Sequence, residues 1–269
     1  MTFIEIEDIR LHCRVEGPDE APAIAFHNSL GTDLRMWDPQ VAALRSSYRV
    51  VRHDSRGHGA SDSPPGPYSI ELLGTDAIGL LDELEIERAD VCGISMGGLV
   101  AQWLAAEYPE RIARAIFAST AVKIGSNDFW DERVRAVDAG GMDAIRDAVM
   151  ERLLTSSFRE RSPRLTRQVE ATLESTPADG YVASCLAVRN ADLTDLVGSI
   201  RAPSLIVAGA DDVATPPSEA KKLHERIAGS ELVVLEDASH LCSIEQPERF
   251  NQVVLGFLGA GGDEARRNP

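Results

Sequence analysis

Cysteine is scarce in this chain of 269 residues, and its four cysteines lie far apart with no C-x-x-C pair among them. This spacing indicates neither a disulfide framework nor a zinc site, and it favours a reducing compartment. No apolar run reaches the length of a membrane span, and residues 1–20 alternate apolar with charged residues where a signal peptide would be continuously apolar. These absences predict a cytoplasmic protein.

Basic residues are also few, since 27 Lys and Arg stand against 43 Asp and Glu and give a formal net charge of −16. A surface this acidic repels phosphate, so the composition argues against nucleic acid and anionic membranes as partners. An anionic small molecule would have to be met by locally placed arginines. The length suffices for one large α/β domain with a substantial core.

What the sequence does contain is a regular alternation of short apolar runs and helical patterns. Residues 3–15 alternate apolar with polar side chains around Glu7-Asp8, which predicts an antiparallel hairpin at a sheet edge. Further strands are predicted at residues 23–26, 48–51, 89–94, 113–117, 205–208 and 232–235, and helices at 38–44, 70–84, 99–107 and 219–227. This order predicts a mostly parallel eight-stranded sheet with helices on both faces and a ligand crevice at the carboxyl ends of the strands.

The alternation breaks once, between about Thr120 and Ser199, where helical periodicity continues without a clear strand. Strand signals then resume, so the strands before and after this stretch are expected to share one sheet. We therefore expect a helical cap, residues 120–199, inserted into a core formed by residues 1–119 and 200–269. The Gly-rich, charged tail from Gly259 to Pro269 is expected to fray.

The predicted strand at residues 89–94 runs directly into Gly93-Ile94-Ser95-Met96-Gly97, and an apolar helical pattern follows at once. A G-x-S-x-G turn between a strand and a helix strains the serine backbone and leaves its hydroxyl clear of the sheet. Side chains at positions 93 and 97 would collide where the helix folds back over the strand end. Ser95 is the predicted nucleophile, and the alternative is a glycine-rich turn that only ends a buried strand.

A serine nucleophile needs an adjacent base that is itself oriented by a carboxylate. In this architecture the partners follow the serine in the order acid, then histidine. Residues 209–212 read Gly-Ala-Asp-Asp after one late strand, and residues 237–240 read Asp-Ala-Ser-His after the last. His240 is the predicted base, and Asp212 is preferred to Asp211 as the acid. The alternatives are that both acids only cap a turn and that the histidine is an ordinary core or surface residue.

An oxyanion that develops during attack by Ser95 needs backbone donors. One is expected to be the N–H of Met96. The other is expected from the loop after the strand at residues 23–26, which reads His27-Asn28-Ser29-Leu30-Gly31. The N–H of Ser29 is the first choice and that of Leu30 the alternative, while His27 is expected to support the loop.

These motifs resemble the α/β-hydrolase superfamily over nearly the whole chain. A narrower resemblance is to the 3-oxoadipate enol-lactonases of the β-ketoadipate pathway. The residues that carry it are Asn28-Ser29-Leu30-Gly31-Thr32-Asp33-Leu34, Trp37-Asp38-Pro39-Gln40, Pro64-Pro65-Gly66-Pro67-Tyr68, Gly93-Ile94-Ser95-Met96-Gly97-Gly98, Trp130, Arg133, Gly140-Gly141-Met142, Gly180-Tyr181, Ala191-Asp192-Leu193 and Ala214-Thr215-Pro216-Pro217.

The narrower resemblance implies a serine hydrolase, without cofactor or metal, that opens 3-oxoadipate enol-lactone to 3-oxoadipate. Ser95 would attack the lactone carbonyl, His240 would take its proton, Asp212 would hold the imidazole, and water would then release the acid from Ser95. The substrate carries a carboxylate, for which Arg133 is the candidate clamp, with Trp130 as an apolar wall. The alternative is a charged helix surface with an ordinary core tryptophan.

Two other functions remain open. A carboxylesterase of the same fold that acts on another small ester or lactone would share the three catalytic residues and differ in the cap. A non-catalytic hydrolase fold used as a binding module belongs to a different class, and the ordered presence of nucleophile, acid and base argues against it.

Overall fold

The computed structural model of the chain describes residues 2–7 and 9–260. Its sheet contains β1 (Thr2–Ile6), β2 (Ile9–Glu16), β3 (Ala23–His27), β4 (Arg49–His53), β5 (Ala89–Ile94), β6 (Ile112–Ala118), β7 (Ser204–Gly209) and β8 (Glu231–Leu235). The helices outside the β6–β7 connection are η1 (Leu34–Trp37), α1 (Asp38–Leu44), α2 (Ile70–Glu83), α3 (Met96–Glu107), α9 (Pro217–Arg226), α10 (Cys242–Glu245) and α11 (Pro247–Ala260).

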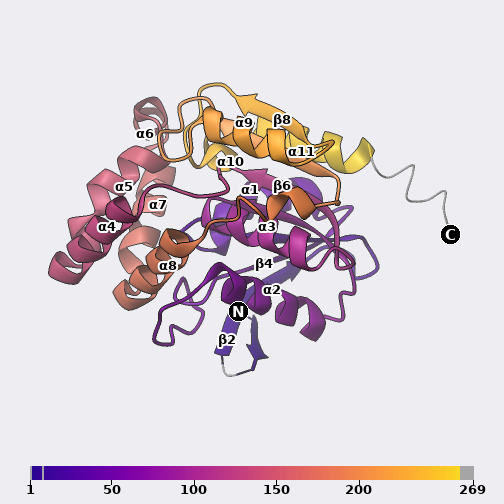
Figure 1. Cartoon of the computed structure of the whole chain (residues 1–269), viewed down its shortest axis with the longest axis horizontal. Helices are drawn as coiled ribbons and strands as arrows, with labels where there is room; N and C mark the ends of the chain where they lie inside the picture. Colours follow the sequence, from indigo (N-terminus) through magenta and orange to yellow (C-terminus); the bar gives the residue numbers. More distant parts are fainter. Residues whose placement is uncertain (1, 8, 261–269) are drawn as a thin grey trace.

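The connection from β6 to β7 contains helices and loops, with no strand among the described residues. It contains α4 (Asn127–Gly140), η2 (Met142–Ala144), α5 (Arg146–Leu153), α6 (Ser156–Arg161), α7 (Pro163–Ser175), α8 (Ala178–Asn190) and η3 (Val197–Ser199). Helices α4 to α7 gather at one side of the sheet, on the left in Figure 1. All of these helices fall between residues 120 and 199.

The sheet order is β1-β2-β4-β3-β5-β6-β7-β8. Strand β2 is antiparallel to β1 and β4, while β3 to β8 pair in parallel, so the predicted edge hairpin and mostly parallel eight-stranded sheet are confirmed. The chain moves from β3 outward to β4 and then returns to the other side of β3 to form β5. This reversal creates a crevice beyond the carboxyl ends of β3 and β5, where α/β sheets bind their ligands.

Helices cover both faces of the sheet (Figure 1), with α1 packed on α11 and α2 packed on α3. Every residue of β3, β5 and β7 is buried, because strands covered on both faces have no solvent side. Rigid, fully buried strands therefore carry the loops that follow β3, β5 and β7.

The C-terminal helices are absent from the sequence-based expectation, which contains no helix after residue 240. Pro247 at the first position of α11 and the buried Phe250, Val254 and Phe257 at helical spacing are the signals for it. The sequence places the start of the frayed tail at Gly259, which is wrong, because Gly259 and Ala260 belong to α11. Residues 261–269 lie outside the described residues.

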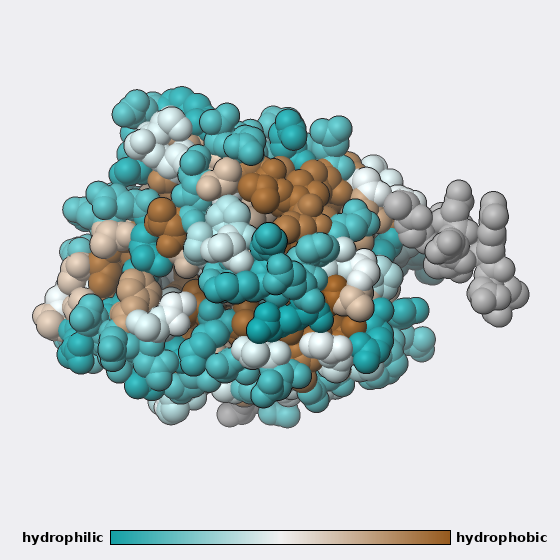
Figure 2. Space-filling model, turned by 45° about the horizontal axis from the view of Figure 1, so that its top comes forward, coloured by the Kyte–Doolittle hydropathy of each residue, from teal (hydrophilic) through white to brown (hydrophobic). Residues whose placement is uncertain are grey.

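Polar side chains dominate the face shown in Figure 2, with one clear apolar area toward the upper right. In Figure 1, β8 and α11 lie in this part of the molecule, and they carry the exposed Val234 and Leu255. Within the described part of the chain, none of the helices has the length and apolar character that a membrane crossing requires. Cys13, Cys92, Cys185 and Cys242 are free thiols, and all four are buried.

Candidate active site

Ser95 lies in the sharp turn between β5 and α3. Its backbone angles are φ 56° and ψ −115°, a sparsely populated conformation for any residue except glycine. The Ser95 N–H donates to the carbonyl of Ala118 at 3.1 Å, and its carbonyl accepts from Thr120 Oγ1 at 2.9 Å. The surrounding structure therefore holds Ser95 in the strained geometry that a nucleophile elbow requires.

The glycines on either side of Ser95 are required sterically, as the sequence predicts. A Cβ on Gly93 would lie 1.9 Å from the carbonyl oxygen of Gly97, and a Cβ on Gly97 would lie 2.1 Å from that of His27. Backbone atoms cannot give way at these distances. The two glycines thus allow α3 to fold back over β5 and β3, which brings the loop after β3 next to Ser95.

Ser29 and Leu30, in the loop after β3, line the same cavity as Ser95. The Gly31 N–H donates to His58 Nε2 at 3.0 Å and the Thr32 N–H to the Ser29 carbonyl at 3.2 Å. For the N–H groups of Ser29 and Leu30, the described residues provide no acceptor. Both groups are therefore available as donors, as is the N–H of Met96, which begins α3 and has no partner within the helix.

Asn28 holds this loop in place from inside the core. Its side-chain amide donates to the carbonyl of His53 at 2.7 Å, and its side-chain oxygen accepts from Trp37 Nε1 at 2.9 Å. Both polar ends of a buried side chain are thus satisfied, so the loop is anchored to β4 on one side and to η1 on the other.

His240 and Asp212 form a buried pair at the carboxyl ends of β8 and β7, with 2.9 Å between His240 Nδ1 and Asp212 Oδ2. The Asp212 carboxylate also accepts from Thr215 Oγ1 at 2.8 Å and from the N–H groups of Ala214 and Thr215 at 2.8 and 3.0 Å. The neighbouring Asp211 is exposed, and no bond joins its side chain to His240. Of the two candidate acids, only Asp212 contacts the histidine.

Opposing effects set the pKa of Asp212. Burial raises it, but the His240 ring and the hydrogen bonds from Thr215 outweigh burial and leave the pKa below its ordinary value. The carboxylate is therefore charged at neutral pH, and it fixes the proton of His240 on Nδ1. Nε2 remains free to accept a proton.

His240 and Ser95 line one cavity, together with Ser29, Leu30 and Ala214 from the core. No hydrogen bond joins the Ser95 hydroxyl to His240 within the described chain. Hydrogen bonds between a nucleophile and its base are often loose without substrate and tighten when it binds. Ser95, which follows β5, and His240, which follows β8, thus line one cavity, and Asp212 contacts His240.

The opposite wall of the cavity comes from the helical insertion. Phe129, Trp130 and Arg133 project from one face of α4, while Val149, Arg152 and Leu153 project from one face of α5. Both sets have the spacing that places side chains on a common helix face. Trp130 is buried and fixed by a bond from Nε1 to the carbonyl of Ile124 at 2.6 Å. Trp130 and Arg133 therefore border the same cavity as Ser95.

Arg133 and Arg152 both lie over the aromatic ring of Phe129. Their guanidinium carbons are 4.8 and 4.6 Å from the ring centroid, and Arg133 Nη1 donates to the Tyr181 hydroxyl at 3.2 Å. Burial and the charge of Arg133 lower the pKa of Arg152. Neither arginine forms an ion pair with a carboxylate of the described residues, so two cations face the cavity of an acidic protein.

Sequence reasoning misses Arg152, Phe129 and Thr215 as residues of this site. The i, i+3 and i+4 spacing of Val149, Arg152 and Leu153 places one arginine on an otherwise apolar helix face, and that is the signal in α5. Thr215 carries no comparable signal, since its contact with Asp212 depends on the turn after β7.

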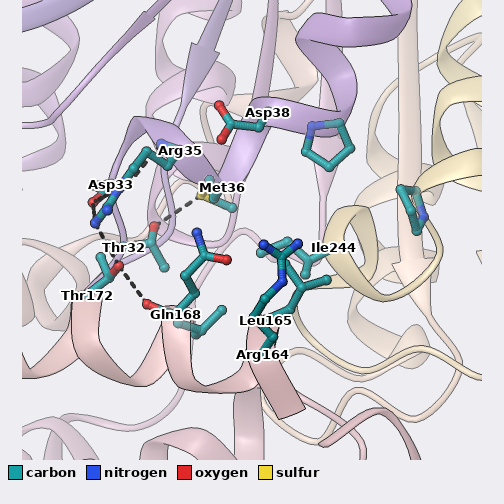
Figure 3. A pocket seen from close by; sticks show the side chains of 13 residues that line it. Thr32, Asp33, Arg35, Met36, Asp38, Arg164, Leu165, Gln168, Thr172 and Ile244 are labelled. Carbon is teal, nitrogen blue, oxygen red and sulfur yellow. Dashed lines mark hydrogen bonds and ion pairs between the residues drawn. The ribbon is translucent and has the colours of Figure 1, made fainter. Parts of the chain in front are cut away.

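A second cavity, of about 370 Å³, lies between α7 and η1. Figure 3 shows that Asp33 is paired with Arg35, which reaches Thr172 of α7 at 3.1 Å. Ser95, Asp212 and His240 do not line it. The candidate active site is therefore the smaller cavity that contains Ser95.

Two buried histidines lie behind Ser95, in a small space lined also by Met96 and Gly97. The His27 and His53 ring centroids are 5.5 Å apart, and His27 Nε2 and His53 Nδ1 find no hydrogen-bond partner in the described chain. Burial, with a contribution from His53, lowers the pKa of His27 to about 3, and burial lowers the pKa of His53 to about 4. Both rings are therefore neutral in the folded protein at neutral pH.

Acid is expected to destabilise the fold through these two rings. Unfolding restores their ordinary pKa of about 6.5, so below that pH the unfolded chain binds more protons and stability falls. The loss is about 2 kcal/mol per ring at pH 5. Urea unfolding at pH 7 and pH 5 measures it, and His53→Gln should reduce the difference by one ring's share. An equal difference in His53→Gln and in the wild type would contradict this assignment.

Comparison with known proteins agrees with this geometry. The α/β hydrolase fold family model matches residues 22–247, so the chain belongs to this family of hydrolases. Over 252 residues, 94% of each chain, it is 43% identical to 3-oxoadipate enol-lactonase 2 of Acinetobacter baylyi. The enol-lactonase-like resemblance predicted from the sequence is thereby confirmed.

Solved structures give the same result. The crystal structure of the enol-lactonase from Burkholderia xenovorans superposes with a TM-score of 0.94 at 42% identity, covering 96% of this chain and 100% of that one. A thermophilic esterase from Thermogutta terrifontis, solved with malate bound, gives a TM-score of 0.91 at 28% identity, with coverage of 97% and 99%. The chain is thus an enzyme similar to enol-lactonases.

Proposed function

We propose that this hydrolase opens 3-oxoadipate enol-lactone to 3-oxoadipate through an acyl-enzyme on Ser95. The observation that carries the proposal is one cavity that holds a strained serine, a histidine paired with a buried carboxylate, and two arginines without a carboxylate partner in the described chain. The similarity to two enol-lactonases over almost the whole chain supports the choice of substrate.

In the first half of the reaction, His240 Nε2 takes the proton of Ser95 while Oγ attacks the lactone carbonyl. The N–H of Met96 and that of Ser29, with Leu30 as the alternative, bind the oxyanion of the tetrahedral intermediate. The intermediate collapses by breaking the ring C–O bond. The leaving enol oxygen stays tethered to the acyl chain and receives the proton from His240.

In the second half, His240 removes a proton from water, which attacks the ester carbonyl of the acyl-enzyme. Collapse of this second intermediate breaks the bond to Ser95 Oγ, returns the proton to the serine and releases the carboxylate product. Asp212 holds the imidazole in the tautomer that both steps need and stabilises its charged form. No redox partner or metal enters this balance.

The two arginines recognise the substrate carboxylate. A net charge of −16 repels such an anion at long range, so local cations are needed where it binds. Arg133 is the proposed clamp, Arg152 adds a second positive charge, and Trp130 and Phe129 provide apolar surface for the ring. Anion binding would also offset the repulsion that Arg133 exerts on Arg152.

The proposed function assigns different roles to the core and the cap of the chain. Residues 1–119 and 200–269 are proposed as the hydrolase core, which carries the nucleophile, acid and base, and residues 120–199 as the cap, which selects the substrate. Small lactones or esters are the proposed partners, and the cytoplasm is the proposed location, with no role for nucleic acid or membrane.

Steady-state kinetics with two kinds of substrate test which of them the enzyme prefers. The enol-lactone is expected to be hydrolysed with a kcat/KM that exceeds that of simple p-nitrophenyl esters. Preference for the esters by orders of magnitude would favour the second candidate, a carboxylesterase, for which the similarity to the thermophilic esterase is the supporting observation.

Arg133→Ala is expected to raise KM for the lactone about 10- to 100-fold, since a hydrogen bond to a charged group contributes roughly 1.5–3 kcal/mol. KM for p-nitrophenyl acetate, which has no carboxylate, should stay unchanged. Arg135→Ala is the matched control, because it removes the same charge from an exposed position of α4. Equal effects of Arg133→Ala on both substrates would remove the clamp role.

A further inference from the structure

Glu245, at the end of α10, has a buried carboxylate with an unusual set of partners. Oε1 accepts from the N–H of Ser239 at 2.7 Å. Oε2 accepts from the N–H of Thr155 at 3.1 Å and from its hydroxyl at 2.6 Å. In the part of the chain that the structure describes, no cation lies within ion-pair distance of Glu245. One carboxylate thus joins the residue before His240 to the segment that links α5 and α6.

Two more hydrogen bonds run in parallel with this link. The Leu241 N–H donates to the carbonyl of Leu153 at 3.0 Å, and the Ser239 hydroxyl donates to the carbonyl of Arg152 at 3.1 Å. The residues on both sides of His240 are therefore fastened to the end of α5. The same turn of α5 carries the Arg152 and Leu153 side chains that line the cavity.

Burial and hydrogen bonding have opposite effects on the pKa of Glu245. Burial raises the pKa of Glu245, and the hydrogen bonds from Thr155 and Ser239 offset that effect only in part. A raised carboxyl pKa means that folding favours the neutral form, so this group stabilises the fold at low pH and loses that contribution as pH rises through its folded pKa. The contacts of Glu245 explain the carboxylate instead, because both of its oxygens accept hydrogen bonds, one from Ser239 and the other from Thr155.

We propose that Glu245 is a positioning residue for His240. Its two oxygens hold residues 239–241 against Thr155 and the end of α5, so that the imidazole of His240 keeps its place in the cavity that Ser95 also lines. Both oxygens must accept, because each faces an N–H group. A glutamine has only one acceptor oxygen and would turn its NH₂ group toward the N–H of Ser239 or of Thr155. This role rests on the proposed function, because it requires His240 to act as the base.

Glu245→Gln tests the role with little change in shape. A misplacement of the base by about 1 Å can cost about 100-fold in rate, so kcat for p-nitrophenyl acetate is expected to fall about 10- to 100-fold. KM should stay within about threefold, since no substrate contact is removed. Labelling of Ser95 by a fluorophosphonate should slow by the same factor as kcat, because labelling needs the same activated hydroxyl.

Asp90→Asn is the matched control. Asp90 is a buried carboxylate of β5 that accepts from Arg114 at 2.9 and 2.7 Å, at the end of the strand away from Ser95. Its loss should lower Tm and leave kcat and the labelling rate unchanged at a temperature well below Tm. Glu245→Gln, measured equally far below its own Tm, should reduce both rates.

A second pair of variants keeps the test independent of how well Glu245→Gln folds. Thr155→Val removes the hydroxyl donor to Glu245 and should lower kcat about 3- to 10-fold, whereas Thr155→Ser keeps the donor and should match the wild type. Glu245→Gln or Thr155→Val with wild-type kcat and labelling rate would overturn the positioning role, whatever happens to Tm.

A different set of results would refute the proposal that the enol-lactone is the substrate. A wild-type enzyme that turns over p-nitrophenyl acetate and is labelled on Ser95, but ignores the enol-lactone, would refute the lactonase proposal. The predicted effects of Glu245→Gln on the ester and on labelling would stand. A wild-type enzyme that is not labelled on Ser95 would overturn both.

Discussion

Replacement of Ser95 with alanine is expected to lower kcat for the enol-lactone by about 10⁴- to 10⁶-fold. The change removes the hydroxyl oxygen that we propose attacks the lactone carbonyl. It leaves the backbone contacts to Ala118 and Thr120 in place, so the fold should survive with a Tm close to that of the wild type. Steady-state kinetics and thermal unfolding of the purified variant measure both quantities.

Ser204→Ala provides the control for this change. Ser204 is also a buried serine, but it lies at the start of β7, at the opposite end of the sheet from the cavity, and its hydroxyl donates to the carbonyl of Ala202 at 2.8 Å. Its loss should leave kcat unchanged. A loss of only a few-fold in Ser95→Ala would mean that another group attacks the substrate.

Asp212→Asn is expected to lower kcat by about 10⁴-fold, with the fold intact. An asparagine would turn an amide donor toward His240 Nδ1, which then has to give up its proton and accept. The proton moves to Nε2, so the imidazole can no longer take the proton of Ser95. Titration of the histidine by NMR, alongside steady-state kinetics, would report the changed tautomer.

Asp211→Asn is the matched comparison, because it alters the adjacent carboxylate, which is exposed. Its kcat should stay within about twofold of the wild type. The reverse pattern, with a large loss in Asp211→Asn and a small one in Asp212→Asn, would assign the acid to the other residue.

The sheet and the elbow could be predicted because their signals are local. Short apolar runs mark the strands, and Gly93 is required by a contact with the backbone of Gly97, four residues later. The contact that requires Gly97, with the backbone of His27, is long-range. The order of Ser95, Asp212 and His240 follows from strand topology, since the loops after β5, β7 and β8 all meet at one edge of the sheet. Long-range geometry is thus encoded here in short-range patterns.

Sequence patterns alone could not decide between Asp211 and Asp212. Adjacent residues in a loop point in different directions, and the turn conformation decides which one reaches His240. In this turn the N–H groups of Ala214 and Thr215 hold the Asp212 carboxylate. The sequence contains these residues but does not show which way the turn folds.

Arg152 and Glu245 could not be assigned a role from sequence for a different reason. Arg152 lies in a helix rich in charged residues, where an arginine usually faces solvent. Glu245 lies in a segment without a chemical motif. Their roles depend on how the helices between β6 and β7 pack on the loop after β8, and that packing is tertiary.

The nucleophile can be identified directly by quenching steady-state turnover of the enol-lactone with acid and locating the bound acyl group by peptide mass spectrometry. The expected result is one lactone-derived acyl group on the peptide that contains Ser95, and none in Ser95→Ala. An acyl group on another residue, or lactone hydrolysis that Ser95→Ala retains, would contradict the role of Ser95 as the nucleophile.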